Sequence, residues 1–343
     1  MIAVVTGSSG FVGSHLVEAL AGAGWTVRRL VRPESAPAPP ALPDALARRV
    51  ETYAAPLADA DALGRSPALD AALDGADAVF HLAGVTKRRT LAEFRAGNVA
   101  PTAALLDALA ARAAAPGAGP PRLVFVSSQA AAGAARAADR PRTERDAAEP
   151  VGAYGHSKRE AERLVMAHPG GLPWTIVRPS AVYGPRDRDF LPVFRHAARG
   201  VALYPGTRDA WLSMVYVGDL ARALVLAATA PQAVGGTYFV AGDERVPWPA
   251  VYDAAAAAAG RRMRVAVDAP AVVLAAAGLA GDAWAALTHR DVLVTREKLR
   301  LARPRFWCCS AARARLELGW VPAVGLAEGA RRTYAWYRAQ GLV

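Results

Sequence analysis

A glycine-rich turn near the N-terminus constrains the fold of this chain more than any other feature. In MIAVVTGSSGFVGSHL, Gly7, Gly10 and Gly13 follow a five-residue apolar run and precede an amphipathic stretch. A strand, a glycine-rich turn and a helix in this order let the backbone approach a pyrophosphate, which the free N–H groups of the helix then bind. A close-packed strand–helix turn without a ligand would use the same glycines, and the spacing is not G-x-G-x-x-G. The choice therefore depends on residues elsewhere.

Apolar runs of strand length alternate with helical patterns along the first half of the chain. The expected strands are IAVVT, WTVRRLV, DAVFHLA, RLVFVSS and WTIVRP, and the expected helices lie at 11–24, 91–115 and 154–167. This alternation predicts an α/β fold with a doubly wound parallel sheet of the Rossmann type. Proline-rich or polar stretches at 33–43 and 129–152 are expected to be loops at strand ends.

The domain boundaries are expected to be interleaved. Residues 1–184 would form a dinucleotide-binding Rossmann domain, to which residues 213–241 return, with a strand and a helix at 215–227. A smaller substrate-binding lobe would take residues 185–212 and 242–343, where the pattern loosens into shorter elements.

Composition describes an ordinary globular protein and excludes several classes. Hydrophobic residues make up 53% and charged residues 21% of the 343 residues, and the formal net charge is +11. The excess is scattered arginine with no basic block interleaved with aromatics, so we expect no nucleic-acid partner. A positive surface favours an anionic cofactor or substrate instead.

Neither disulfides nor a metal site is expected. Cys308 and Cys309 are adjacent, and a bridge between neighbours is strained, so both should be reduced. The histidines lack metal-ligand spacing. Met1 leads directly into a strand, so we expect no signal peptide and a cytoplasmic protein. The apolar stretch 269–280 is too short to span a bilayer and is expected to be a buried helix, with a patch resting on a membrane as the alternative.

Support for a nucleotide-binding site comes from the segment Tyr154-Gly-His-Ser-Lys158. Tyr154 and Lys158 are four residues apart, so they share one helix face with Ala161 and Val165. Lysine occurs only three times in the chain, and a lysine in an apolar stripe is costly without partners. An exposed lysine on an ordinary helix is the alternative.

The order of these motifs resembles the extended short-chain dehydrogenase/reductases. The resemblance rests on TGSSGFVG, HLAG (81–84), RAGNVAPT (95–102), FVSSQAAAG (125–133), YGHSK (154–158) and RPSAVYGP (178–185), and weakly on LGWVPAVGLAEGARRTYAWY. That family is the NAD-dependent epimerase/dehydratase-like group, and RPSAVYGP and VRRLVRP are similar to its dihydroflavonol reductase and 3β-hydroxysteroid dehydrogenase branch.

The resemblance implies catalytic roles for three residues. Tyr154 would be the general acid/base, its pKa lowered by the Lys158 ammonium, which would also hold the nicotinamide ribose. Ser128 would orient and polarise the substrate oxygen. Ser127 fits a strand-end cap better, and His81 fits a packed strand end.

The resemblance also implies the wall of the cofactor site. Asn98 would brace the cofactor side, as the family asparagine does. The full set of expected cofactor-binding residues is Gly7, Ser9, Gly10, Phe11, Val12, Gly13, Arg32, Leu57, Leu82, Ala83, Gly84, Asn98, Ser127, Tyr154, Lys158, Pro179 and Val182.

Two departures from the family pattern bear on the cofactor. Val31 stands where a carboxylate would bind the adenosine 2′-hydroxyl, and Arg32 follows it. An arginine there pairs with a 2′-phosphate, so NADP(H) is expected, with NAD(H) possible and a plain surface arginine as the alternative. Pro56 replaces an aspartate that often contacts adenine, so the Leu57 backbone is the remaining candidate for the adenine contact.

Three functions remain open from the sequence. The favoured one is NADP-dependent hydride transfer between the nicotinamide and a ketone or secondary alcohol of a small, non-nucleotide substrate. A nucleotide-sugar epimerase is the alternative, although Ser180, Leu212 and Ser213 replace residues typical of such enzymes and only Arg208, from a shifted register, would grip a diphosphate. A dehydratase is disfavoured because Gln129 and Ala130 replace its Asp-Glu pair. A catalytically idle nucleotide-binding module conflicts with the intact Ser128, Tyr154 and Lys158.

The sequence also gives general expectations for the substrate cleft and the oligomeric state. The cleft would be built from 129–152, 183–211 and the C-terminal lobe, with Phe190, Tyr204 and Trp211 as its lining. Family members commonly dimerise through two long helices, here 91–115 and 154–167, so a homodimer is expected.

Overall fold

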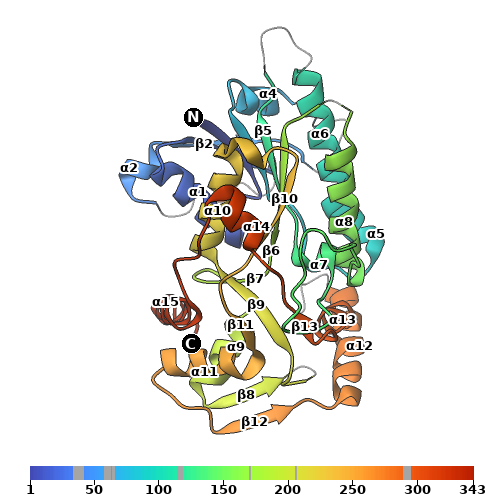
Figure 1. Cartoon of the computed structure of the whole chain (residues 1–343), viewed down its shortest axis with the longest axis vertical. Coiled ribbons are helices and arrows are strands. Elements are labelled where there is room, and N and C mark those ends of the chain that lie inside the picture. The colour runs from blue at the N-terminus through green and yellow to red at the C-terminus, as the bar shows by residue number, and fades with distance from the viewer. Residues whose placement is uncertain are drawn as a thin grey trace.

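The chain folds into a large α/β layer structure with a smaller lobe attached at one end of its sheet (Figure 1). The computed structural model describes residues 1–33, 42–57, 63, 66–113, 119–169, 171–204, 207–288 and 295–343. Most of the loop expected at 33–43 therefore lies outside the described residues.

A seven-stranded parallel sheet forms the centre of the large layer structure. Its order is β10-β6-β5-β4-β1-β2-β3, with every neighbouring pair parallel. The strands are β1 (Ile2–Thr6), β2 (Thr26–Val31), β3 (Val50–Ala54), β4 (Ala78–His81), β5 (Arg122–Val126), β6 (Trp174–Pro179) and β10 (Gly236–Val240). The predicted fold class is confirmed.

Helices cover both faces of this sheet, and side-chain alternation along the strands explains why. In β1, Ala3 and Val5 belong to the core under α1 and α10, while Val4 belongs to the core under α4, α6 and α8. All three side chains are fully buried. The helices and turns of this layer are α1 (Phe11–Gly22), α2 (Asp44–Ala47), α4 (Pro67–Leu73), α5 (Leu91–Phe94), a π-helical turn (Arg95–Val99), α6 (Ala100–Ala113), α7 (Gln129–Ala132), α8 (Gly152–Ala167), α10 (Val217–Thr229), a 3₁₀ turn (Pro231–Ala233) and α14 (Ala312–Leu318).

The strand order reverses between β1 and β4, and this is where the fold provides a crevice. β1 continues to β2 and β3 on one side, whereas β4, β5 and β6 extend on the other. In open parallel sheets such a reversal leaves a space at the carboxyl ends of the strands, where ligands bind. The glycine-rich turn follows β1 at this point.

The smaller lobe is built mainly from segments that follow β6. It contains a sheet of β11, β9 and β13, with β7 also on β9, and a separate β8–β12 pair. Aromatic pairs such as Phe194–Tyr337 fill its core. Its elements are β7 (Ala181–Tyr183), α9 (Leu191–Ala198), β8 (Val201–Tyr204), β9 (Trp211–Tyr216), β11 (Arg245–Pro247), α11 (Trp248–Ala258), β12 (Val265–Asp268), α12 (Ala271–Thr288), α13 (Arg296–Ala302), β13 (Phe306–Trp307) and α15 (Leu326–Ala339).

The segment expected to return to the first lobe does so only in part. Helix α10 packs along α1, and β10 extends the main sheet beside β6. The strand before α10 is β9, which pairs with β7, β11 and β13 in the smaller sheet. The expectation that a strand at 215–227 joins the first lobe was therefore wrong, because β9 finds its backbone partners in the second lobe.

The stretch 129–152 is not wholly a loop. Its first residues form the helical turn α7, and Ser128 caps this turn by accepting a hydrogen bond from the Ala130 N–H at 3.1 Å. Further along, Arg142 exchanges backbone hydrogen bonds with Cys308 and Ser310, which ties the stretch to β13. The cap expected at Ser127 therefore belongs to Ser128.

The stretch 269–280 is helical but not buried. It forms much of α12, where Val272 and Leu279 are 75% and 56% exposed. The expectation of a buried helix was wrong, because α12 contacts the rest of the molecule through one narrow face. None of the described helices combines the length and the hydropathy that a bilayer-spanning segment needs.

Cys308 and Cys309 are both free and buried. Burial raises the pKa of the Cys308 thiol to about 11, and it also raises the pKa of Cys309. Neutral, buried thiols are poor nucleophiles. Neither residue lines the cavities described below.

Candidate active site

Two cavities meet at the glycine-rich turn and form one groove along the carboxyl ends of the strands. They measure about 510 and 550 Å³ and share Gly7, Gly10, Leu82, Gly84 and Val85 in their walls. Every residue expected to be catalytic or cofactor-binding lines one of the two. Residues predicted from six separate motifs are thus brought to one place.

The glycines of the turn are required by close backbone contacts. Gly7 has φ +68°, and a Cβ there would lie 2.7 Å from the Ala83 nitrogen at the end of β4. A Cβ on Gly13 would lie 2.2 Å from the Gly7 carbonyl oxygen. The turn therefore packs against two neighbouring backbones with no room for side chains. No side chain caps the N-terminus of α1 at Gly10, which leaves its N–H groups available to an anion.

Ser128, Tyr154 and Lys158 converge in the 510 Å³ cavity. Ser128 ends the strand segment after β5, while Tyr154 and Lys158 lie one turn apart on α8. Burial raises the pKa of the Tyr154 phenol, and a hydrogen bond with Ser128 opposes that rise. In the protein alone the phenol is therefore protonated at neutral pH, contrary to the expected lowering, and it is ready to donate a proton.

Lys158 is a buried ammonium with few partners. Its Nζ donates to the Val126 carbonyl oxygen at 2.7 Å and lies 4.5 Å from the centre of the Phe125 ring. Burial lowers its pKa to about 8, although the Glu162 charge raises it. An ammonium has three N–H donors, so Lys158 has capacity to hold a further acceptor in the groove.

Sequence reasoning missed Glu162, which lies one turn beyond Lys158 on α8. Arg178 of β6 donates to both of its carboxylate oxygens, at 2.7 and 2.8 Å, in a buried bidentate pair. Burial would raise the pKa of Glu162, but the hydrogen bonds and charge of Arg178 hold it below the usual value. The pair fixes α8 to β6 and thereby positions Lys158. The signal in the sequence was the i, i+4 spacing of Lys158 and Glu162 on the inward face.

Asn98 and His81 each join neighbouring segments of the large layer structure. Asn98 accepts from the Val85 N–H at 2.7 Å and donates to Val85 O and to Ser157 Oγ, so it fixes the loop after β4 to α8. His81 is buried between Thr6 and Thr102. Burial lowers its pKa to about 3, so it is neutral and serves packing.

The other cavity lies beside the end of β2 and contains Arg32, Leu57 and Ser9 in its wall. Arg32 is exposed, whereas Leu57 is buried and its N–H donates to Ala55 O at 2.9 Å. That N–H is therefore already used by the Ala55 carbonyl.

Arg29 is a second residue that sequence reasoning missed. It is fully buried on β2, where it donates to Ser8 Oγ at 3.3 Å and Thr52 Oγ1 at 3.4 Å. Its Nη2 has no hydrogen-bond partner, and no carboxylate among the described residues pairs with it. Burial lowers its pKa. A buried guanidinium without an anion is costly, and this one contacts the glycine-rich turn.

The far end of the 510 Å³ cavity reaches the smaller lobe. Phe190 lines it as expected, together with Asp187 and Asp189. Burial raises the pKa of Asp187 to about 6, against hydrogen bonds from the Asp189 and Phe190 N–H groups. Tyr204, expected as lining, is instead in the lobe core 5.3 Å from the Tyr252 ring. Neither Trp211 nor the stretch 129–152 lines this cavity. Trp211 of β9 pairs with Phe306 of β13, and the stretch 129–152 forms backbone hydrogen bonds with residues of β13 and the segment after it.

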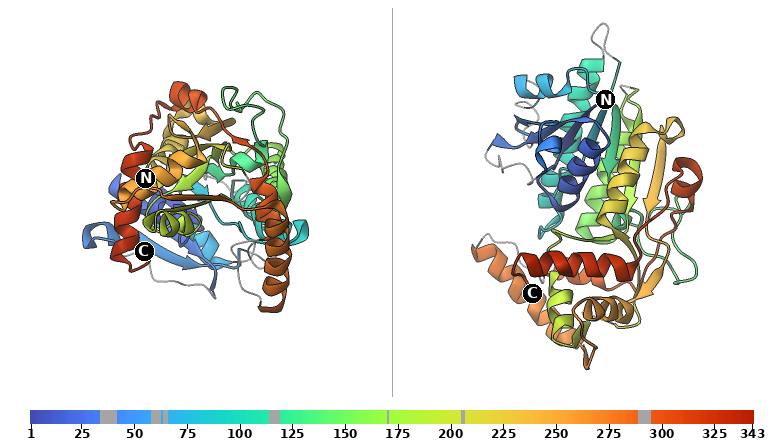
Figure 2. Two further views of the ribbon diagram at one scale, coloured as in Figure 1. Left: turned by 90° about the horizontal axis from the view of Figure 1, so that it is seen from below. Right: turned by 90° about the vertical axis from the view of Figure 1, so that its left-hand side faces the viewer.

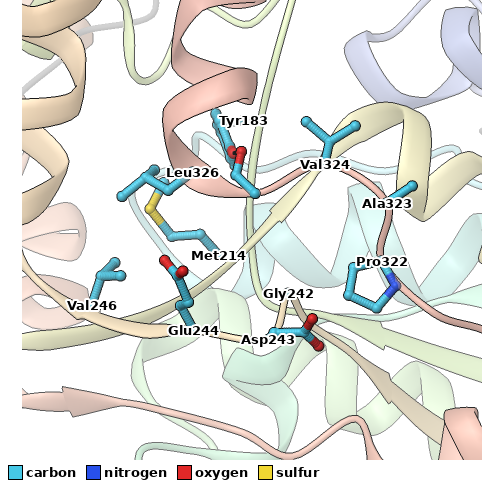
Figure 3. A pocket seen from close by; sticks show the side chains of 11 residues that line it. Tyr183, Met214, Gly242, Asp243, Glu244, Val246, Pro322, Ala323, Val324 and Leu326 are labelled. Carbon is cyan, nitrogen blue, oxygen red and sulfur yellow. Dashed lines mark hydrogen bonds between the residues drawn. The ribbon is translucent and has the colours of Figure 1, made fainter.

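A smaller hollow of about 210 Å³ lies between β7, β9 and the segment before α15 (Figure 3). Tyr183, Met214 and Leu326 meet at one end of it, while Asp243 and Glu244 supply its acidic groups (Figure 3). Asp243 is paired with Arg315. None of the predicted catalytic residues lines this hollow, so the groove remains the candidate active site. No cluster of three or more potential metal ligands occurs among the described residues.

Comparison with known proteins identifies the family of the chain. The model of the NAD dependent epimerase/dehydratase family matches residues 3–242, which include the whole groove around the glycine-rich turn. The chain belongs to this family. The resemblance inferred from the motifs is thus confirmed, and the chain is an enzyme of an NAD(P)-binding family.

Its relatives include reductases and dehydrogenases. The chain is 33% identical to a ceramide reductase of Caulobacter vibrioides, over 99% of this chain and 95% of that protein. It is 32% identical to a 3β-hydroxysteroid dehydrogenase/Δ5→4-isomerase of Mycobacterium tuberculosis, over 69% of this chain and 64% of that protein. A solved UDP-glucose 4-epimerase of Thermotoga maritima is similar in fold, with a TM-score of 0.76, 22% identity and 99% of each chain covered.

The close contacts of the turn predict the effect of two alanine substitutions. Gly13→Ala should destabilise the protein by about 1–3 kcal/mol and abolish dinucleotide binding, because its Cβ collides with the Gly7 carbonyl. Gly22→Ala on the same helix is the matched control, since nothing lies within 4 Å of a Cβ there. Thermal unfolding and calorimetry would check both. Equal behaviour of the two variants would contradict the assigned packing.

The lowered pKa of Lys158 predicts a pH dependence of dinucleotide affinity. Below about pH 8 the ammonium is charged, and above it the amine becomes neutral and loses a donor. Affinity should therefore fall roughly tenfold between pH 7 and 9.5. Lys158→Met should bind weakly with little slope over the same range, as measured by calorimetry. An unchanged slope in this variant would show that another group titrates.

Proposed function

We propose that this protein is an NADP-dependent oxidoreductase that transfers a hydride between the nicotinamide and a ketone or secondary alcohol of an apolar substrate. The observation that carries the proposal is the grouping of Ser128, Tyr154 and Lys158 in the wall of one cavity that opens onto the glycine-rich turn. The named relatives, a ceramide reductase and a hydroxysteroid dehydrogenase, support the same reaction class.

The groove fits a dinucleotide on physical grounds. The uncapped N-terminus of α1 offers N–H groups to a pyrophosphate, and the side-chain-free glycines let it approach. Lys158 has spare donors for ribose hydroxyls at one end, and Arg32 lines the other. The guanidinium of Arg29 contacts the glycine-rich turn through Ser8 Oγ. Bound NADPH would supply the hydride from C4 of its nicotinamide.

The protein's own residues would handle the proton and the orientation of the substrate. Ser128 Oγ donates a hydrogen bond to the substrate carbonyl oxygen and polarises it. Tyr154, protonated in the ligand-free enzyme, gives its proton to the same oxygen as the alcohol forms, and the phenolate recovers a proton from solvent. The Lys158 ammonium stabilises the transient phenolate.

Arg29 and Arg32 support a preference for the 2′-phosphate of NADP(H). Side chains two residues apart on a strand share a face, so Arg29 lies on the same face as Val31, where a carboxylate would select NAD. A phosphate beside Arg29 would offset its unpaired buried charge. Arg32 lines the same end of the groove.

Apolar walls support an apolar substrate. Val85, Val126, Ala181 and Phe190 line the cavity near Tyr154. The arginine proposed for a diphosphate, Arg208, lies outside this cavity and pairs with Asp268 on the surface. Leu212 and Ser213 are buried in β9. These positions give no support to a nucleotide-sugar epimerase.

The domain division and the oligomeric state belong to the same proposal. Residues 185–212 and 242–343 would hold the substrate over the dinucleotide domain. We also propose a homodimer formed through 91–115 and α8, supported by the exposed Leu164 and Met166 on α8. Sedimentation of the purified protein would test the dimer directly.

Tyr154→Phe tests the proton donor. The variant should bind NADPH nearly as tightly as the native protein and turn over roughly 10²- to 10⁴-fold more slowly, because only the acid is lost. His156→Ala, at an exposed position of the same helix, is a control that leaves the phenol in place. Full turnover by Tyr154→Phe would refute the mechanism.

Calorimetry with NADPH and NADH tests the cofactor. NADPH should bind at least about tenfold more tightly, and Arg29→Leu and Arg32→Ala should each weaken NADPH roughly tenfold or more without affecting NADH. Arg28→Leu is the matched control, since Arg28 points to the other face and donates to Ala72 O. Tighter binding of NADH would favour a retained-NAD epimerase, and binding of neither would reject an enzyme of this type.

A further inference from the structure

Helix α12 presents a face to solvent on which every described exposed side chain is apolar. Leu287, Trp284 and Leu279 are 79%, 60% and 56% exposed. The exposed set of α12 is Val272, Val273, Ala275, Ala276, Leu279, Ala280, Ala283, Trp284 and Leu287. The spacing 272, 276, 279, 283 and 287 is that of one helical stripe. Isolated exposed apolar residues are common, but a continuous stripe marks an interaction surface.

The neighbouring strand pair extends this apolar surface. Val265 and Val267 of β12 are 51% and 42% exposed, and Leu203 of β8 pairs with Val267 and is 40% exposed. Only two residues separate β12 from α12. β12 lies at the outer end of the smaller lobe, and α12 runs from there along the side of the lobe towards α13 (Figures 1 and 2).

Unpaired positive charge lies beside the apolar surface. Arg261, Arg262 and Arg264 immediately precede β12 and are exposed. None of these three forms an ion pair within the described part of the chain. Arg303, after α13, is also exposed. An apolar helical face with arginines at its edge is typical of segments that lie in the interface of an anionic bilayer.

We propose that α12 and β12 form a docking surface for an anionic lipid bilayer, on which the protein rests without crossing it. The apolar face of α12 would enter the boundary of the acyl chains, and the arginines before β12 would contact lipid phosphates. A second copy of the chain is a poorer occupant, because two such surfaces would bring like charges together.

Helix α13 connects the docking surface to the candidate active site. Gly278 of α12 packs against α13, where a Cβ would lie 2.8 Å from Leu299. On α13, the buried Glu297 accepts a hydrogen bond from the Tyr154 N–H at 3.1 Å. A bilayer under α12 would therefore lie one helix away from the N-terminus of α8. We further infer that the bilayer supplies the apolar ketone that the enzyme reduces. This part of the proposal rests on the proposed function.

Flotation of the full-length protein with vesicles tests the docking surface. Vesicles of phosphatidylcholine with about 30 mol% phosphatidylglycerol should carry the protein upward, and pure phosphatidylcholine should carry far less. Leu279→Glu/Leu287→Glu should lower the bound fraction by about tenfold, because two carboxylates would enter the interface. Leu316→Glu/Val321→Glu is the matched control, since it adds the same charge at exposed apolar positions elsewhere.

The outcomes separate this proposal from the proposed function. NADPH binding, measured on the same preparations, should be unchanged in both double variants. Absence of vesicle binding by the native protein, or equal loss in both variants, would overturn the docking surface while leaving the enzyme intact. A dimer that dissociates on Leu279→Glu/Leu287→Glu without any vesicle binding would identify a second copy as the occupant and also overturn it. Vesicle binding without NADPH binding would reject the proposed function alone.

Discussion

The close approach of three backbones at the reversal of the strand order is the constraint on which the groove depends. The Gly7 turn touches the end of β4, and Gly13 brings the start of α1 onto Gly7. A side chain on Gly7 would collide with the backbone after β4, and a side chain on Gly13 would collide with the Gly7 carbonyl. The same contacts leave the N-terminus of α1 open, so packing and anion binding have one structural cause.

Two buried cations at or beside the groove lack a full set of hydrogen-bond acceptors. Among the described residues, Lys158 makes a single hydrogen bond, one helical turn from Tyr154, and Arg29 keeps an orphaned nitrogen beside the turn. Native proteins rarely retain buried charges at such cost unless a ligand offsets them. In the proposed function, one anionic dinucleotide would satisfy both ends of the groove. The lowered pKa of Lys158 then reflects the burial of its ammonium in the site that this ligand would fill.

The sequence predicted the main sheet and the groove because both depend on local patterns. Alternating apolar runs fix the strands, and the spacing of Tyr154 and Lys158 fixes a shared helix face. It did not predict the partners of β9, which are set by long-range pairing, nor the exposure of α12, whose composition alone is that of a core helix. Arg29 was missed because β2 carries two adjacent arginines, Arg28 and Arg29, and only the fold shows which of them is buried.

The most direct test of the account is a crystal structure of the protein soaked with NADP⁺. We expect the pyrophosphate at the N-terminus of α1, the 2′-phosphate beside Arg29 and Arg32, and the nicotinamide C4 facing the space next to Tyr154 and Ser128. Such density would join the reactive carbon to the proton donor in one cavity. A dinucleotide bound with its nicotinamide away from Tyr154, or no dinucleotide in the groove at saturating concentration, would contradict it.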